Sequence, residues 1–265
     1  MKLLIDIGNT CTKLAVGCSG KSCRKGEIVY IERKNDLESW SGLFSRIGSI
    51  YPIKACAVSC VGHYDATLTA ALQAQAWPHI WLGYDTPCML HDTPQGYGSD
   101  RLADDLGAIV VLQEQIPHAT ADDITRDGLL VIDAGTCITY DFITADGHYL
   151  GGNISPGVEM RLEALHARTA RLPRIEADGD TPDVGYDTTT AIRAGVVRGI
   201  GYELQGCIRH WQKRHARLKI FLTGGDRYAF SDAVRVNLLT DSHLVARGLN
   251  RLLQYQQEQQ GLHAR

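Results

Sequence analysis

The segment Lys2–Lys13 reads KLLIDIGNTCTK, and Leu129–Tyr140 nearly repeats it as LLVIDAGTCITY. In both, an apolar run leads into an aspartate, Asp6 or Asp133, and then through glycine and threonine to a cysteine and a second threonine. Each copy is typical of a strand, a turn and a return strand. Since the copies start about half a chain apart, we expect a duplicated domain whose two equivalent loops face each other across a cleft.

Outward from each copy, short apolar runs alternate with amphipathic segments, which favours an α/β fold with mixed sheets. We expect strands at residues 2–6, 12–17, 27–32, 55–61, 79–82, 129–133, 138–143, 148–153 and 219–225. We expect helices at residues 37–47, 67–75, 101–114 and 188–214, with two more that start near Gly157 and after Ser242. The polar stretch His118–Asp127 is the expected boundary between an N-terminal domain, residues 1–120, and a C-terminal domain, residues 121–265.

The composition is that of a globular chain, with 44% hydrophobic and 22% charged residues over 265 positions. A net charge of −3 argues against a nucleic-acid partner. The basic run Arg209–Lys219, RHWQKRHARLK, has its apolar residues at helical spacing, so we interpret it as a solvated helix face rather than a nucleic-acid site.

Eight cysteines without a CxxC pair predict buried free thiols. The N-terminal apolar run is too short for a signal peptide, and no stretch approaches the roughly 18 apolar residues expected of a membrane span. We therefore expect a soluble cytoplasmic protein without a membrane partner.

The two repeated loops have the chemistry of a phosphate clamp. A turn of glycine and small hydroxylated residues presents backbone N–H groups, to which Asn9, Thr10 and Thr12 add side-chain donors and Lys13 adds charge. Asp6, at the end of its apolar strand, is placed to hold a magnesium ion that neutralises phosphate. One such loop is most often an ordinary hairpin turn; the matched pair favours function.

A third element is KIFLTGGDR, in which an apolar strand ends in Thr223, Gly224 and Gly225. The two glycines let a ligand approach the backbone closely. Beside a two-loop phosphate clamp, this is where an adenine or ribose would lie. By itself it would be an ordinary strand end.

Together these parts resemble the ASKHA superfamily, which includes sugar kinases, acetate kinase and actin. Within it, five motifs in order resemble the type III pantothenate kinases over essentially the whole chain. They are DIGNTCTK at Asp6–Lys13, GSDR at Gly98–Arg101, DAGTCITYD at Asp133–Asp141, GGNISPGVEM at Gly151–Met160 and DTTTAIRAG at Asp187–Gly195. The resemblance implies an α/β fold of two ribonuclease-H-like domains with mixed sheets and a cleft between them.

The resemblance also implies roles for individual residues. ATP would be bound by Asp6, Ile7, Gly8, Asn9, Thr10, Cys11, Thr12, Lys13 and Thr136, with magnesium near Asp6. Asp133 would hold a monovalent cation, potassium or ammonium. Within the substrate-binding motif Gly98, Ser99, Asp100 and Arg101, Asp100 would accept the proton of the substrate hydroxyl and Arg101 would pair with the substrate carboxylate.

Several substrate contacts stay open. Thr188 matches a substrate-binding threonine, with Thr189 and Thr190 one or two positions away, and Asp187 or Thr188 could equally cap the following helix. His91 stands where many relatives have a substrate-contacting tyrosine. Tyr97 lies nearby but aligns with a family leucine. His166 could also reach the substrate, although a lone histidine on a helix is more often structural.

The expected function is ATP-dependent phosphorylation of pantothenate to 4'-phosphopantothenate, the first step of coenzyme A biosynthesis, by a homodimer. The alternative is a non-catalytic, nucleotide-binding accessory factor for transcription. The intact set Asp6, Asp100, Arg101 and Asp133 favours the enzyme, since a protein that had lost catalysis would be expected to have lost one of them. A sugar or acetate kinase shares the clamp but gives no reason for GSDR or for so short a chain.

Overall fold

The computed structural model describes residues 1–18, 27–63, 65–115, 128–144, 147–225 and 238–263. The chain divides into two compact units, one of residues 1–119 with 243–265 and one of residues 120–242. The expected boundary segment His118–Asp127 lies outside the described residues. The C-terminal segment differs from the prediction, because residues 243–265 belong with the first unit and not with the second.

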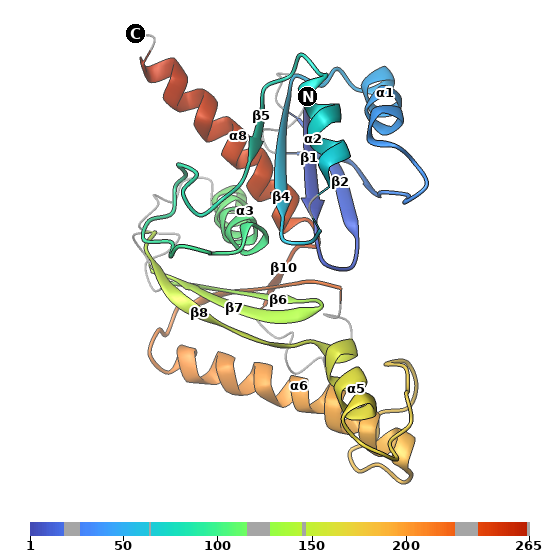
Figure 1. Ribbon diagram of the computed structural model, residues 1–265. Helices are drawn as coiled ribbons and strands as arrows, with labels where there is room; N and C mark the ends of the chain where they lie inside the picture. The colour runs from blue at the N-terminus through green and yellow to red at the C-terminus, as the bar shows by residue number, and fades with distance from the viewer. Residues whose placement is uncertain (19–26, 64, 116–127, 145–146, 226–237, 264–265) are drawn as a thin grey trace. The chain divides into compact units, whose positions relative to one another are not determined.

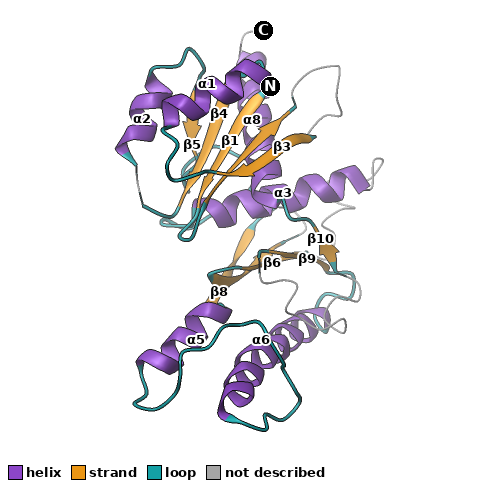
Figure 2. Ribbon diagram, turned by 90° about the vertical axis from the view of Figure 1, so that its right-hand side faces the viewer, coloured by secondary structure: helices purple, strands orange, loops and turns teal. Residues whose placement is uncertain are grey.

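The first unit is a five-stranded mixed sheet with helices on both faces (Figures 1 and 2). Its elements are β1 (Lys2–Ile7), β2 (Thr12–Gly17), β3 (Ile28–Arg33), α1 (Trp40–Ile50), β4 (Ala55–Cys60), α2 (Ala66–Gln73), β5 (His79–Trp81), α3 (Ser99–Gln115) and α8 (Leu244–His263). The strand order is β3-β2-β1-β4-β5, in which β2 is antiparallel to β1 and β3, while β1, β4 and β5 run parallel.

The second unit repeats this topology. Its elements are β6 (Leu129–Ala134), β7 (Cys137–Ile143), β8 (Tyr149–Pro156), α5 (Val158–Ala167), α6 (Thr188–Gln212), β9 (Lys219–Thr223) and β10 (Leu239–Thr240). The strand order β8-β7-β6-β9-β10 and the strand directions match those of the first unit one for one. The predicted fold class, a duplicated α/β fold with mixed sheets, is therefore confirmed.

Alternation along β1 divides the core of the first unit. Leu3, Ile5 and Ile7 pack against α1 and α2, in a cluster that includes Leu43 and Leu68. Because successive side chains of a strand point to opposite faces, Lys2, Leu4 and Asp6 face the other way. On that side the Lys2 ammonium donates to the backbone oxygen of Asn250 in α8 at 3.2 Å. The same alternation therefore turns Asp6 away from the cluster that packs against α1 and α2.

The start of α1 and the state of Cys18 differ from the sequence predictions, and the sequence does not predict β10. Helix α1 begins at Trp40 rather than near Leu37, because the Ser39 side chain accepts from the Gly42 N–H and caps the helix there. Cys18 is disulfide-bonded, whereas free thiols were expected throughout. The other cysteines that the structure describes are free: Cys11, Cys56, Cys60, Cys88, Cys137 and Cys207.

Candidate active site

The first loop joins β1 to β2 in a tight turn that the Gly8 N–H closes on the Cys11 oxygen at 3.1 Å. The Ile7 oxygen accepts from the N–H groups of Val61 and Gly62, both at 3.0 Å, which ties the loop to the end of β4. A Cβ atom on Gly62 would lie 2.3 Å from the Gly8 oxygen, so only glycine permits this approach. Of the predicted ATP contacts in this loop, Asn9, Thr10 and Lys13 are exposed.

Asp6 carries a carboxylate with an unusual environment. Its Oδ1 atom is buried and has no hydrogen-bond partner. Burial is the main cause that raises the pKa of Asp6 to about 6, and the nearby charge of Asp100 adds to it. Lys13, its cross-strand neighbour, and a hydrogen bond from Ser59 act in the opposite direction. The structure thus brings two predicted site residues, Asp6 and Asp100, within electrostatic reach of each other.

A pair of buried hydroxyls connects this strand edge to helix α3. Ser59 lies opposite Asp6 in the parallel β1–β4 ladder, and its Oγ is 3.1 Å from the Oγ of Ser99. The Ser99 Oγ also accepts from the Cys60 N–H at 2.9 Å. Sequence reasoning missed Ser59. A serine inside the otherwise apolar run AVSCV was the available signal, but its significance depends on the strand pairing.

The GSDR motif forms the start of α3. Asp100 lies in the first turn, where a carboxylate is favoured by the helix dipole, and its Oδ1 accepts from the Arg101 N–H at 2.8 Å. The Arg101 guanidinium lies over the ring of Tyr97, with its carbon 4.8 Å from the ring centroid. Tyr97 is buried and donates its hydroxyl to Oδ2 of Asp105 at 2.6 Å. His91 is exposed.

The second loop is built by close backbone approaches within its own unit. The Gly157 N–H, at the start of α5, donates to the Thr136 oxygen at 3.0 Å. Gly224, with a φ of +96°, packs so closely that a Cβ atom would lie 2.2 Å from the Ala134 oxygen and 2.5 Å from Oδ1 of Asp133. The predicted TGG strand end therefore lies directly against the DAGT loop.

The predicted residues further along the second unit have local partners. Asp187 is the N-cap of α6 and forms a capping box with Thr190, whose N–H it accepts at 2.7 Å. Thr190 is buried, while Thr188 is exposed. Nδ1 of His166 is 2.9 Å from the Leu172 oxygen, a contact just past the end of α5. These geometries show capping roles for Asp187 and Thr190, while the Thr188 side chain is exposed.

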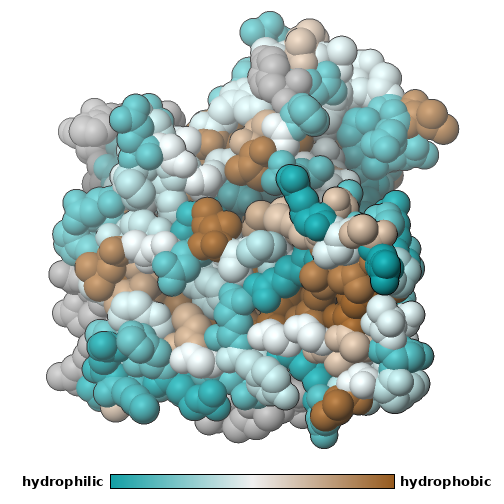
Figure 3. Space-filling model, turned by 60° about the horizontal axis from the view of Figure 1, so that its bottom comes forward, coloured by the Kyte–Doolittle hydropathy of each residue, from teal (hydrophilic) through white to brown (hydrophobic). Residues whose placement is uncertain are grey.

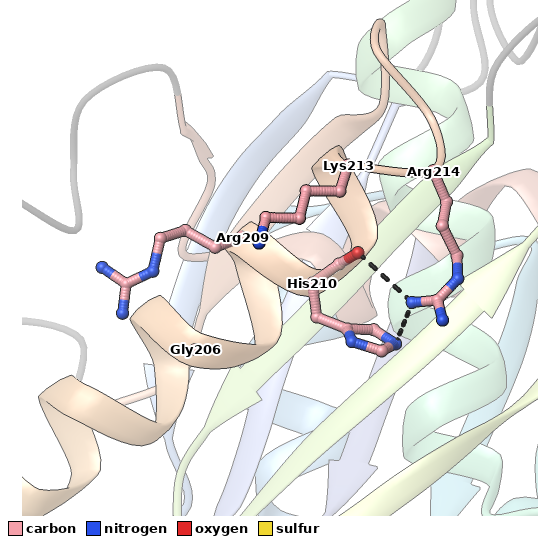
Figure 4. A pocket seen from close by; sticks show the side chains of 5 residues that line it. All are labelled: Gly206, Arg209, His210, Lys213 and Arg214. Atoms are coloured by element: carbon pink, nitrogen blue, oxygen red, sulfur yellow. Dashed lines mark hydrogen bonds between the residues drawn. The ribbon is translucent and has the colours of Figure 1, made fainter.

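A pocket of about 450 Å³ lies on the exposed face of α6 and contains none of the predicted site residues (Figure 4). Its lining residues are Gly206, Arg209, His210, Lys213 and Arg214. All of them are exposed, in agreement with the solvated face predicted for the basic run. Arg214 hydrogen-bonds to the ring and the backbone oxygen of His210.

A sequence profile of the type III pantothenate kinases matches residues 2–210. The chain belongs to this family. A type III pantothenate kinase of Phocaeicola vulgatus is 42% identical over 260 residues, which cover 96% of this chain and 98% of that protein. One of Bacteroides fragilis is 41% identical over 258 residues, again 96% of this chain and 98% of that protein.

Among solved structures, a candidate Baf family transcriptional activator of Campylobacter jejuni aligns with a TM-score of 0.57 at 20% identity. The alignment covers 97% of this chain and 99% of that one, and it shows the shared fold. Within the described residues of this pantothenate kinase family member, no helix is long and apolar enough to cross a membrane. Nor do those residues contain a cluster of three or more histidine, cysteine or acidic side chains suited to a metal ion.

Proposed function

We propose that the chain is a pantothenate kinase that transfers the γ-phosphoryl group of ATP to the terminal hydroxyl of pantothenate, the first step of coenzyme A biosynthesis. The observation that carries the proposal is the arrangement of Asp6 and Asp100. A strand-end carboxylate with a buried unpartnered oxygen lies near a second carboxylate at a helix N-terminus. Relatives with the kinase name align over nearly the full chain and support the same conclusion.

In this proposal Asp100 accepts the proton of the substrate hydroxyl. The hydrogen bond from the Arg101 N–H fixes the orientation of its carboxylate, and the helix dipole favours its charged, proton-accepting form. Phosphoryl transfer has a loose transition state, so the main task of such a base is to position the nucleophile. Arg101 holds the pantothenate carboxylate through its bidentate fork.

Asp6 is the residue that fits a magnesium ion. A buried carboxylate oxygen without a partner, on a group whose pKa burial raises, is the donor that a hard divalent cation would satisfy. When bound with ATP, the ion supplies charge neutralisation at the phosphate oxygens. The loop Gly8–Thr12, with Lys13, is proposed to bind the phosphates of ATP, and Thr136 is proposed as a further ATP contact.

Asp133 is proposed to hold the monovalent cation, potassium or ammonium. Its carboxylate lies at the TGG strand end, where a Cβ atom on Gly224 would be 2.5 Å from Oδ1 of Asp133. A carboxylate oxygen is a donor that suits hard cations. Thr188 is proposed as a substrate contact. His91 and His166 are secondary candidates, because both side chains are exposed and His166 contacts the Leu172 oxygen.

A homodimer is the proposed assembly. The second unit leaves β8 at the edge of its sheet and exposes large apolar side chains. Figure 3 shows hydrophobic residues (brown) among polar ones on one face of the molecule. The large exposed apolar side chains described in this unit are Leu150, Ile154, Met160, Val184, Tyr186 and Tyr202. Open edges and apolar patches of this kind are usually covered by a partner. We place the enzyme in the cytoplasm, where ATP is available.

The test is a phosphorylation assay with pantothenate, ATP, magnesium and potassium. Asp100→Asn is expected to lower turnover by roughly 10²–10⁴ without unfolding the protein. Asp36→Asn, which changes an exposed aspartate of the same unit in the same way, is the matched control and should retain activity. Formation of 4'-phosphopantothenate by wild type and control alone would support both reaction and base.

Near-normal activity of the Asp100 variant would remove Asp100 from its role. If wild type forms no product yet binds ATP, the regulator alternative would take precedence. The structural likeness to a candidate transcriptional activator does not favour that alternative now, because at 20% identity it concerns the fold alone.

A further inference from the structure

Tyr97 contacts two residues of α3 that lie one helical turn apart. Its ring lies under the Arg101 guanidinium, with the carbon 4.8 Å from the centroid. Its hydroxyl donates to Oδ2 of Asp105 at 2.6 Å. Both Tyr97 and Asp105 are buried, at 6% and 0% exposure. The Tyr97 N–H donates to the Pro94 oxygen at 3.0 Å, so the backbone that carries the ring is also held.

This arrangement restrains Arg101 in a particular way. A guanidinium is a flat group with two faces and an edge of parallel N–H donors. The Tyr97 ring holds this group through a cation–π contact, with the guanidinium carbon 4.8 Å from the ring centroid. Such a contact restrains the guanidinium without requiring a hydrogen bond from its N–H donors. The hydrogen bond to Asp105 in turn locks the ring, because Asp105 projects from the same face of the same helix four residues on.

We propose that Tyr97 is a positioning residue for Arg101 and thereby sets the preference of the enzyme for a substrate that carries a carboxylate. The inference rests on the proposed function, in which Arg101 binds that carboxylate. In this inference Tyr97 does not bind the substrate directly, since its hydroxyl donates a hydrogen bond to Asp105. The ring face and not the hydroxyl acts on the site.

The experiment compares Tyr97→Leu and Tyr97→Phe with wild type, using pantothenate and its analogue pantothenol, in which a primary alcohol replaces the carboxylate. Tyr97→Leu should raise KM for pantothenate about threefold to thirtyfold, the range expected for a cation–π contact. The KM for ATP should stay within about twofold. The inhibition constant of pantothenol as a competitor should not change, because it offers no carboxylate. Tyr97→Phe keeps the ring and should show the smaller rise.

Tyr51→Leu is the matched control, because Tyr51 packs against Tyr30 beside the opposite core cluster of the same unit. This variant should leave the ratio of the KM for pantothenate to the inhibition constant of pantothenol unchanged. If Tyr97→Leu does not fold, Phe and its fluorinated analogues at position 97 keep the ring shape while weakening its negative face. KM for pantothenate should then rise with each added fluorine.

Equal losses for pantothenate, pantothenol and ATP, or no loss for pantothenate, would overturn the inference. Failure of the proposed function itself gives a different result, since wild type would then form no 4'-phosphopantothenate at all. A further variant, Arg101→Ala, tests whether Arg101 binds the substrate carboxylate at all. If Arg101→Ala weakens the binding of pantothenate no more than that of pantothenol, Arg101 does not bind the carboxylate. Tyr97 would then have no carboxylate-binding group to position.

Discussion

At the scale of single residues, the carboxylate of Asp6 is poorly solvated and lies near a second negative charge. Its buried Oδ1 has no hydrogen-bond partner, and the neighbouring Asp100 repels its negative charge. A carboxylate in such surroundings favours the protonated form, which is why the pKa of Asp6 rises from 3.8 to about 6. Groups with perturbed pKa values gather at functional sites. There a bound cation offsets the unfavourable free energy of burying a charged carboxylate, which lowers the stability of the ligand-free protein.

Asp6→Asn is therefore expected to stabilise the ligand-free protein while it removes the proposed magnesium ligand. Because the folded state binds the proton more tightly than the unfolded state, the penalty of the charged carboxylate grows as pH rises from about 4 to about 6 and is constant above. At pH 7.5 the variant should gain at most about 3 kcal/mol in unfolding free energy. Chemical denaturation at several pH values measures the difference.

The advantage of the variant should shrink as the pH is lowered towards 5. A difference that stays constant between pH 5 and pH 7.5, or a variant less stable than wild type throughout, would contradict the argument. Kinase activity of the same variant should fall, since an amide is a poor magnesium ligand.

At the scale of secondary-structure elements, helices α3 and α8 cross with almost no space between their backbones. A Cβ atom on Gly248 would lie 1.8 Å from the Ala103 oxygen, and one on Gly107 would lie 2.1 Å from the Leu244 oxygen. Each helix thus contributes one glycine at a point where the other helix presents its main chain. Since Asp100 and Arg101 lie in the first turn of α3, the crossing also helps to fix the position of these two residues.

Gly248→Ala should destabilise the protein by about 1–3 kcal/mol, the usual cost of overpacking, because a backbone oxygen cannot rotate away. Gly48→Ala is the matched control, since Gly48 is an exposed helical glycine of the same unit with nothing within 4 Å of its added Cβ. The control should gain up to about 1 kcal/mol from helix propensity. Thermal unfolding of both variants tests the pair, and equal effects would refute the close crossing.

At the scale of the whole molecule, the last helix returns to the unit formed by the start of the chain. Its buried residues Leu244, Leu249, Leu252 and Leu253 pack within the first unit, where α8 contacts α3, β1, β2 and β4. Four buried leucines represent about 6–12 kcal/mol of hydrophobic stabilisation, an amount comparable to the net stability of a domain. The first unit is thus made from both ends of the chain.

We expect a fragment of residues 120–242 to unfold at the same denaturant midpoint as one of residues 121–265. The extra helix in the longer fragment has no partner there, and limited proteolysis should remove it. Deleting residues 243–265 from the full chain should instead abolish the cooperative unfolding of the first unit. A longer fragment that is clearly more stable than the shorter one would show that α8 belongs with the second unit.

What the sequence determined by itself was local or repeated. Strand alternation, turn glycines and the Asp187 cap are encoded within a few residues, and the duplicated hairpin revealed a fold made twice. Only the tertiary structure decided which distant segments meet. The β1–β4 register sets Ser59 beside Asp6, Tyr97 lies under Arg101, and α8 closes the first unit. The physical reason is that local patterns specify which face of an element is apolar, whereas the partner of that face is selected by the packing of the whole chain.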